Sequence, residues 1–290
     1  MVLSFCEYFK GNTILIYNMK KIVNFYIRAF LIISFISIPF IFIAFEDLNT
    51  KIFSYKIWIA TFCPQFIYIL YLFRKEKLYG TFKTNFFGKG LYNNAILITC
   101  LIPFIIYSFL VGFKLIKVYN YGNWDIEIIV YFILIFFSAL LEEILFRFIP
   151  YKVLINEISI KDVILVSVLF SFFHIFNPNI NIVGLVNVAI AGIFFSLIYL
   201  KSNSIFLTSF IHAFWNFSIG CLLGSNISGI KVISILEYVP KKPFYLSGGD
   251  FGFEGSLITS LFFLMSCVFL YRLKPNESFK KTFYETTKYI

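Results

Sequence analysis

The ionisable side chains that can do chemistry are concentrated in three otherwise apolar segments of the sequence. These segments read LEEILFR at 141–147, FSFFH at 170–174 and HAFWN at 212–216, and both histidines of the chain lie in them. An ionisable residue in the middle of a membrane span costs at least about 2.5–3.5 kcal/mol, so such residues usually face a protein interior and have a function there. We therefore take the three segments as parts of one candidate site.

Helical spacing predicts how the first segment is arranged. Glu143 and Arg147 are four residues apart, in the acid-before-base order that favours an ion pair on one helix face. Glu142 is rotated from Glu143 by about 100°, so its carboxylate can point into a different space. A pair such as Glu143–Arg147 often stabilises a helix, and we expect a mostly structural role for it.

The other two segments place polar groups one helical turn apart. His212 and Asn216 are spaced to face one cavity, and Phe170 lies one turn before His174 and can wall the same space. A single buried histidine is often only an interhelical hydrogen-bonding group. The joint occurrence of a carboxylate, two imidazoles and a carboxamide instead indicates a catalytic cavity.

This set of groups suits peptide hydrolysis by an activated water molecule. A carboxylate or an imidazole can take the proton of the water, a step worth about 10²–10⁴-fold in rate. Donors from histidine and asparagine can then stabilise the oxyanion, and removing one such donor costs about 10²–10³-fold in turnover. The sequence has no serine or cysteine beside either histidine in a nucleophile arrangement and no HExxH zinc motif.

The motifs EExxxR, FxxxH and HxxxN, in this order on hydrophobic spans, resemble the CAAX-protease and bacteriocin-processing family. This family includes the type II CAAX prenyl endopeptidases and the bacterial, immunity-associated Abi proteins. The resemblance covers residues 137–217, and each motif alone is weak, whereas three in order are specific. The residues that match are Glu142, Glu143, Arg147, Phe170, His174, His212 and Asn216.

The resemblance implies a role for each polar residue. Glu142 and His174 would activate the water, and His212 and Asn216 would stabilise the oxyanion. The predicted ion pair of the first motif would shape and orient the site.

The resemblance leaves the cofactor open between none and zinc. Members of the family are described both as metalloproteases and as glutamate-dependent proteases without a metal. Glu142, His174 and His212 with a water molecule would form an open catalytic zinc site. Asparagine is a poor zinc ligand, so the presence of Asn216 favours the metal-free alternative.

The rest of the chain must place these groups in a membrane. Of its 290 residues 60% are hydrophobic and 14% charged, whereas a soluble domain is about 45–50% apolar. Only helices and closed barrels satisfy the backbone in lipid, and the uninterrupted apolar runs exclude the alternation of a barrel. We predict an all-α, polytopic integral membrane protein with about eight transmembrane helices. The apolar runs lie at 29–45, 57–73, 95–113, 126–149, 163–176, 182–200, 204–223 and 256–271.

The motifs divide the chain into three regions. Residues 1–125 form an N-terminal membrane region with about three spans, residues 126–223 hold the catalytic core spans, and residues 224–290 form an outer loop, the last span and a basic cytoplasmic tail. Lysine and arginine favour alternate loops by about 18 to 7, which places both termini in the cytoplasm. We expect the membrane to be a bacterial plasma membrane. The net charge of +10 is thus a topology signal, and no soluble basic patch indicates nucleic-acid binding.

These observations predict an intramembrane endopeptidase that hydrolyses a peptide bond of a membrane-associated or lipidated protein or peptide. The alternative is a catalytically silent membrane scaffold or bacteriocin-immunity factor of the same fold. A proton-coupled transporter fits less well, because the mid-span Pro39, Pro64 and Pro103 have no counterparts in the C-terminal half. The expected partners are membrane lipid and a membrane-associated substrate.

Overall fold

The computed structural model describes residues 2–44, 55–86, 93–121, 126–155 and 158–273. Within these ranges the chain is mostly helical with little strand, which confirms the all-α prediction. The predicted basic tail lies outside the described residues except for its first few positions. The longer helices are α1 (Val2–Ala44), α2 (Tyr55–Lys75), α4 (Asn93–Gly112), α5 (Glu127–Glu143), α7 (Ile182–Ser202) and α8 (Ile205–Phe217). The shorter ones are α3 (Tyr79–Phe86), α6 (Ile160–Phe172), α9 (Phe244–Ser247) and α10 (Leu257–Arg272).

Six helical stretches of the described chain are long and apolar enough to cross a membrane. The predicted fifth span at 163–176 corresponds to α6, whose 13 residues reach about 20 Å, less than the ≈ 30 Å of a bilayer core. The predicted eighth span corresponds to α10, which is apolar but has only 16 residues. The polytopic membrane fold is therefore confirmed, whereas the count of eight spans is not. The six stretches are Ile16–Phe40, Lys56–Lys75, Ala95–Gly112, Glu127–Leu154, Ile182–Ser202 and Ile205–Leu222.

The fourth of these stretches is not a regular α-helix throughout. After α5 the chain continues through two π-helical turns, Ile144–Phe148 and Pro150–Leu154. Such wide turns are rare and occur frequently at functional sites. The first of them contains Arg147 and follows directly on Glu143, so the irregularity lies within the first motif.

Side-chain caps set the start of the helices that carry or support the candidate site. Ser159 and Asp162 form a capping box at the start of α6, and the Asn181 side chain accepts a hydrogen bond from the backbone of Gly184 in α7. α7 ends at Asn203, whose φ of 52° turns the chain back within two residues, and Ser204 then caps α8. These caps satisfy amides that the helix itself leaves without partners.

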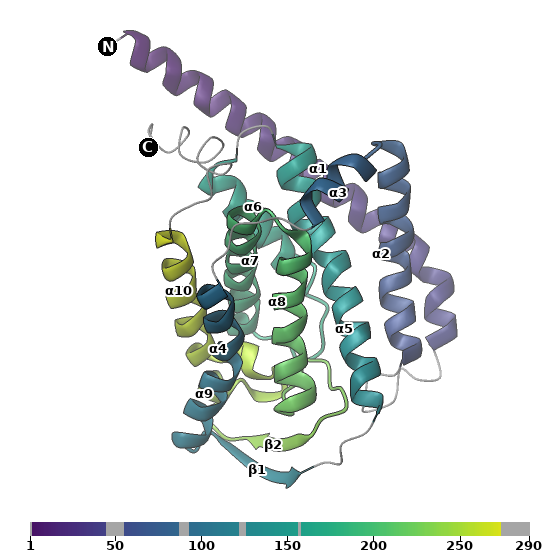
Figure 1. Ribbon diagram of the computed structural model, residues 1–290, viewed down its shortest axis with the longest axis vertical. Helices are drawn as coiled ribbons and strands as arrows, with labels where there is room; N and C mark the ends of the chain where they lie inside the picture. The colour runs from purple at the N-terminus through teal and green to yellow at the C-terminus, as the bar shows by residue number, and fades with distance from the viewer. Residues whose placement is uncertain (1, 45–54, 87–92, 122–125, 156–157, 274–290) are drawn as a thin grey trace.

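The helices form a bundle in which α8 lies against α5, and α6 and α10 both lie against α7 (Figure 1). α6 and α7 approach closely at Gly192, where an added Cβ would lie 2.8 Å from the Cβ of Ser167. Small residues allow this kind of approach between membrane helices. On the outer face of α5, Ile129, Ile133 and Phe137 are exposed, as expected for a lipid-facing surface.

One end of the bundle is closed by irregular structure and a small antiparallel sheet. The sheet pairs β1 (Ile116–Tyr121) with β2 (Leu236–Pro240) and lies near α9 (Figure 1). Two short 3₁₀ turns, Gly249–Phe251 and Phe253–Gly255, lead from there into α10. We call residues 224–256 the loop segment.

Candidate active site

All four predicted catalytic residues line one cavity of about 530 Å³. Glu142 projects from α5, His174 lies just after α6, and His212 and Asn216 project from α8. The cavity is also lined by residues of α1, α2 and α7 and by the loop segment. The structure thus brings together groups that are up to 74 positions apart in the sequence, from 142 to 216.

The predicted ion pair of the first motif is present and fully buried. Arg147 donates from Nη1 to Oε1 of Glu143 over 3.1 Å, and neither side chain is exposed. Nη2 of Arg147 donates to the backbone oxygen of Gly192 in α7 over 3.1 Å. The guanidinium also lies over the ring of Phe170, 4.5 Å from its centre. This ion pair therefore joins α5 to α6 and α7, as expected for a structural role.

Glu143 has a second contact that helical spacing within one segment did not reveal. The same Oε1 atom accepts a hydrogen bond from Nδ1 of His212 over 2.8 Å. Glu143 therefore connects the ion pair to a predicted catalytic histidine on another helix. Its carboxylate orients the imidazole in the way that an acidic residue orients the histidine of other hydrolytic sites.

The ring of His212 is packed on one face as well as hydrogen-bonded at Nδ1. Phe195 of α7 stacks on it, with ring centres 4.4 Å apart and planes inclined by 24°. Phe195 lines the cavity and was missed by the sequence analysis, because one phenylalanine among the 41 in the chain carries no spacing signal. The stacking and the Glu143 hydrogen bond leave Nε2 as the free end of the ring.

His174 lies in the turn that follows α6, not within a transmembrane helix as predicted. α6 ends at Phe172, and the amide of His174 donates to Ser171 O over 2.9 Å. Phe170 still lies next to it as predicted, with the two rings 4.7 Å apart, and its backbone oxygen is 2.9 Å from Nδ1 of His174.

Both histidines therefore have Nδ1 bonded to an oxygen atom that only accepts hydrogen bonds. Nδ1 must carry the hydrogen in each case, so in the neutral rings Nε2 is an acceptor. This geometry gives His174 and His212 the same tautomer. Donation from Nε2 of His212 requires the imidazolium form, in which both ring nitrogens carry hydrogen.

Glu142 and Asn216 differ from Glu143, whose Oε1 accepts hydrogen bonds from both Arg147 and His212. The Glu142 side chain is 24% exposed, and its Oε2 is 4.0 Å from Nε2 of His212, too far for a direct hydrogen bond. No hydrogen bond joins either side chain to another residue in the described part of the chain. Their polar atoms are thus available to a water molecule or a peptide in the cavity.

The predicted zinc ligands do not converge as a set. Among the described residues, no three histidine, cysteine or acidic side chains are grouped closely enough to hold a metal ion. Glu142, His174 and His212 as placed thus do not fit a three-residue zinc site.

The cavity also has a carboxylate that the sequence analysis missed. Glu254 of the loop segment lines it and is 7% exposed. It lies between glycines in a loop, so it has no helical spacing pattern and no basic residue one helical turn away to indicate a role. No signal of the kind used for the helices could have found it.

Fold and cavity together define a polytopic membrane protein with a buried acid–histidine site suited to hydrolysis. Residues 123–218 match the sequence model of the family described as Type II CAAX prenyl endopeptidase Rce1-like. Over this segment the match agrees with the resemblance to the CAAX proteases. No curated protein and no solved structure matches the chain.

Proposed function

We propose that this protein is an intramembrane endopeptidase that hydrolyses a peptide bond of a membrane-associated or lipidated protein or peptide. The observation that carries the proposal is the meeting of Glu142, His174, His212 and Asn216 in one cavity. Neither the Glu142 carboxylate nor the Asn216 amide has a hydrogen bond to another residue in the described chain. Each histidine is hydrogen-bonded at Nδ1 and has Nε2 available. The match of residues 123–218 to an endopeptidase family supports the same conclusion.

The proposed reaction starts with a water molecule bound between Glu142 and His174. Glu142 takes a proton from the water as its oxygen attacks the peptide carbonyl. The negative charge that develops on the carbonyl oxygen is stabilised by the amide of Asn216 and by Nε2–H of protonated His212. The proton held by Glu142 then passes to the nitrogen of the leaving amine, and the C–N bond breaks. Throughout the reaction Glu143 orients the His212 ring by accepting the hydrogen bond from its Nδ1.

We propose that this reaction needs no metal ion. The proposal rests on the placement of the side chains: among the described residues Glu142, His174 and His212 are not grouped closely enough to hold a metal ion, and Asn216 is a poor ligand for zinc. A catalytic zinc ion would instead polarise the carbonyl and activate the water. Treatment with chelators distinguishes these two mechanisms.

The test uses a panel of internally quenched peptides, each made with and without a farnesylated cysteine, added to the purified protein in proteoliposomes. We expect cleavage by the wild-type protein and a loss of about 10²–10⁴-fold in Glu142→Gln. Glu127→Gln, on the same helix but outside the cavity, serves as the matched control and should cleave normally. Equal cleavage by wild-type and Glu142→Gln would contradict the mechanism, and a folded wild-type protein that cleaves no peptide would support the silent scaffold.

A further inference from the structure

The loop segment supplies a buried carboxylate, Glu254, that has no cationic partner in the described chain. Its side chain is 7% exposed. Oε1 accepts a hydrogen bond from Nε1 of Trp215 over 3.0 Å. Oε2 accepts two more, from the amide of Ser228 over 2.6 Å and from its hydroxyl over 2.8 Å. A buried carboxylate without hydrogen-bond partners is very costly in free energy. The three donors to Glu254 offset part of that cost.

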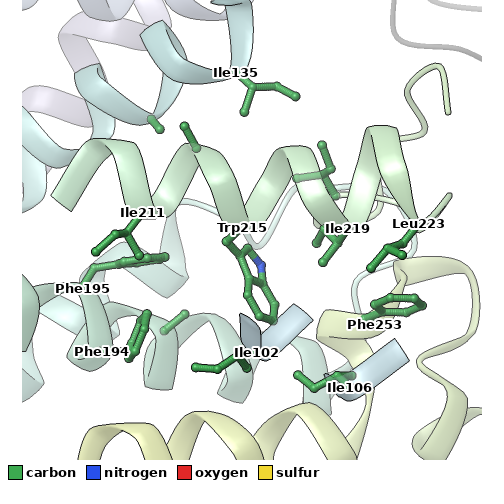
Figure 2. Close-up of a cluster of buried hydrophobic side chains, with 14 of the residues drawn as sticks. Ile102, Ile106, Ile135, Phe194, Phe195, Ile211, Trp215, Ile219, Leu223 and Phe253 are labelled. Atoms are coloured by element: carbon green, nitrogen blue, oxygen red, sulfur yellow. The ribbon is translucent and has the colours of Figure 1, made fainter. Parts of the chain in front are cut away.

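One of these donors belongs to the helix that carries the third motif. Trp215 stands between His212 and Asn216 on α8, immediately before the asparagine. Its indole is buried against Phe263 of α10, with ring centres 4.6 Å apart. Figure 2 shows the indole reaching from α8 into the apolar cluster, with Phe253, the neighbour of Glu254, on one side of it. The hydrogen bond at Nε1 therefore links α8 to the loop segment at a position between His212 and Asn216.

The other donor leads to the segment that carries the second motif. The backbone oxygen of Ser228 accepts a hydrogen bond from the side chain of Asn177 over 3.1 Å. Asn177 lies three residues after His174 in the same turn. Glu254 thus connects, through one residue on each side, to both histidine-bearing parts of the site. Asn177, Ser228, Trp215 and Glu254 all line the cavity that contains Glu142.

The backbone around Glu254 is itself held in place. Asn187 of α7 donates from its side-chain amide to the backbone oxygens of Glu254 and Ser256, over 2.7 and 2.9 Å. Gly252, two residues earlier, has a φ of 93° that side chains rarely adopt. The carboxylate is therefore presented by a rigid loop, as a group that orients other residues requires.

We infer that Glu254 is a positioning residue of the protease site: it holds Trp215 and Ser228 so that His212, Asn216 and His174 face the bound peptide. This inference rests on the proposed function. Glu254 lies outside the segment that matches the family, which ends at residue 218. It acts through α8 and through the turn after α6, and takes no part in proton transfer.

The test compares Glu254→Gln with the wild-type protein on the quenched peptide that the wild-type cleaves and Glu142→Gln does not. Glutamine keeps the size of the side chain but turns an NH₂ group toward one of the three donors. We expect kcat to fall by about tenfold to hundredfold, because small displacements of catalytic groups cost rates of this order. KM should change by less than about threefold, since positioning for the transition state is lost and ground-state binding is not. Asp250→Asn, an exposed carboxylate of the same loop segment, is the matched control and should leave both constants unchanged.

A spectroscopic measurement separates positioning from a purely structural role. The chain has three tryptophans, Trp58, Trp124 and Trp215, so protein labelled with 5-fluorotryptophan gives three ¹⁹F resonances, and Trp215→Phe assigns one of them. In Glu254→Gln we expect the Trp215 resonance to move, and Asp250→Asn should leave it in place. Trp215→Phe should lower kcat as well, and combining it with Glu254→Gln should add little further loss, as expected for coupled residues.

Three results would overturn the inference. The first is an unchanged kcat and Trp215 resonance in Glu254→Gln; the second is lower thermal stability with unchanged kcat in the folded fraction. If Glu254→Gln does not accumulate, Trp215→Phe and Ser228→Ala each remove one donor, and an unchanged kcat in both is the third. A wild-type protein without Glu142-dependent cleavage contradicts the proposed function and the inference together, whereas wild-type cleavage with an unaffected Glu254→Gln contradicts the inference alone.

Discussion

The family-matching segment, residues 123–218, and the loop segment, residues 224–256, both place polar side chains on the same cavity, but they do so by different means. In the first, helices set the direction of Glu142, His212 and Asn216 through regular spacing. In the second, glycines with positive φ and bonded backbone oxygens set the direction of Glu254. Residues on the helical side of the site can therefore be predicted from their spacing in the sequence. Residues on the loop side can be found only from the three-dimensional structure.

The largest effect is expected from breaking the ion pair within the family-matching segment. Arg147→Ala leaves Glu143 buried with only His212 as a partner, and loss of one member of a buried pair costs about 3–5 kcal/mol. We expect lower folded yield and a lower thermal unfolding midpoint in detergent as well as lower turnover. Arg74→Ala, at the exposed end of α2, is the control.

This variant also sharpens the contrast between the two glutamates of the first motif. Glu142→Gln should lower turnover alone, because its carboxylate holds no other residue in place. An Arg147→Ala protein with wild-type stability and reduced turnover would assign Arg147 to the chemistry and contradict its structural role.

A second prediction breaks the loop side of the comparison. In Gly252→Ala the new Cβ would lie 2.2 Å from the backbone oxygen of Asn226, at a φ of 93° and ψ of −171°. Backbone in this region costs roughly 1–3 kcal/mol for a residue other than glycine. We expect lower stability together with a moved Trp215 resonance, because Glu254 lies two residues away.

Gly249→Ala is the matched control for that variant. Its φ of 58° is also positive, but the nearest atom to an added Cβ is 3.4 Å away, so only the backbone strain remains. Equal loss of stability in Gly249→Ala and Gly252→Ala would contradict the close contact between Gly252 and Asn226 as the cause of the damage.

A third prediction probes the close approach of two helices inside the family-matching segment. Gly192→Ala places a Cβ 2.8 Å from the Cβ and 2.9 Å from the Cα of Ser167, and overpacking of this kind costs about 1–3 kcal/mol. The backbone oxygen of Gly192 also accepts from Arg147, so the shift should reach the ion pair. Unfolding midpoints measure the effect, with Gly112→Ala as control, since nothing lies within 4 Å of its added Cβ. Equal midpoints for the two variants would contradict the packing described for α6 and α7.

The smallest effect is expected from removing metal ions. Dialysis against EDTA or 1,10-phenanthroline should leave peptide cleavage by the wild-type protein unchanged, because the proposed proton transfers use side chains only. Loss of cleavage that zinc restores would show that the metal-free proposal is wrong and would favour Glu142, His174 and His212 as ligands.

The sequence predicted those features of the site that depend on the spacing of residues along one helix. The Glu143–Arg147 pair follows from a four-residue separation on one helix, and the contrast between Glu142 and Glu143 from a rotation of about 100°. The contact between Glu143 and His212 joins positions 69 apart, so it depends on how α5 and α8 pack and could not be predicted from spacing.

Other features could not be predicted, because an apolar run in the sequence does not show where a helix ends or how side chains pack. The apolar run at 163–176 was counted as a span, although it is short for a full crossing, and α6 ends at Phe172 and leaves His174 in a turn. Phe195 and Glu254 have ordinary sequence surroundings and gain their importance only from the neighbours that folding brings to them.

The sharing of a single oxygen atom by Arg147 and His212 constrains how this protein can change over evolutionary time. A lineage released from selection for proteolysis can lose Glu142 without disturbing the bundle. It cannot lose Glu143 as freely, because the same substitution strands a buried guanidinium. Descendants that no longer cleave peptides should therefore change first at position 142 and keep the residues at 143 and 147. A relative with the Glu143–Arg147 pair but another residue at position 142 would thus be one that has lost the activity.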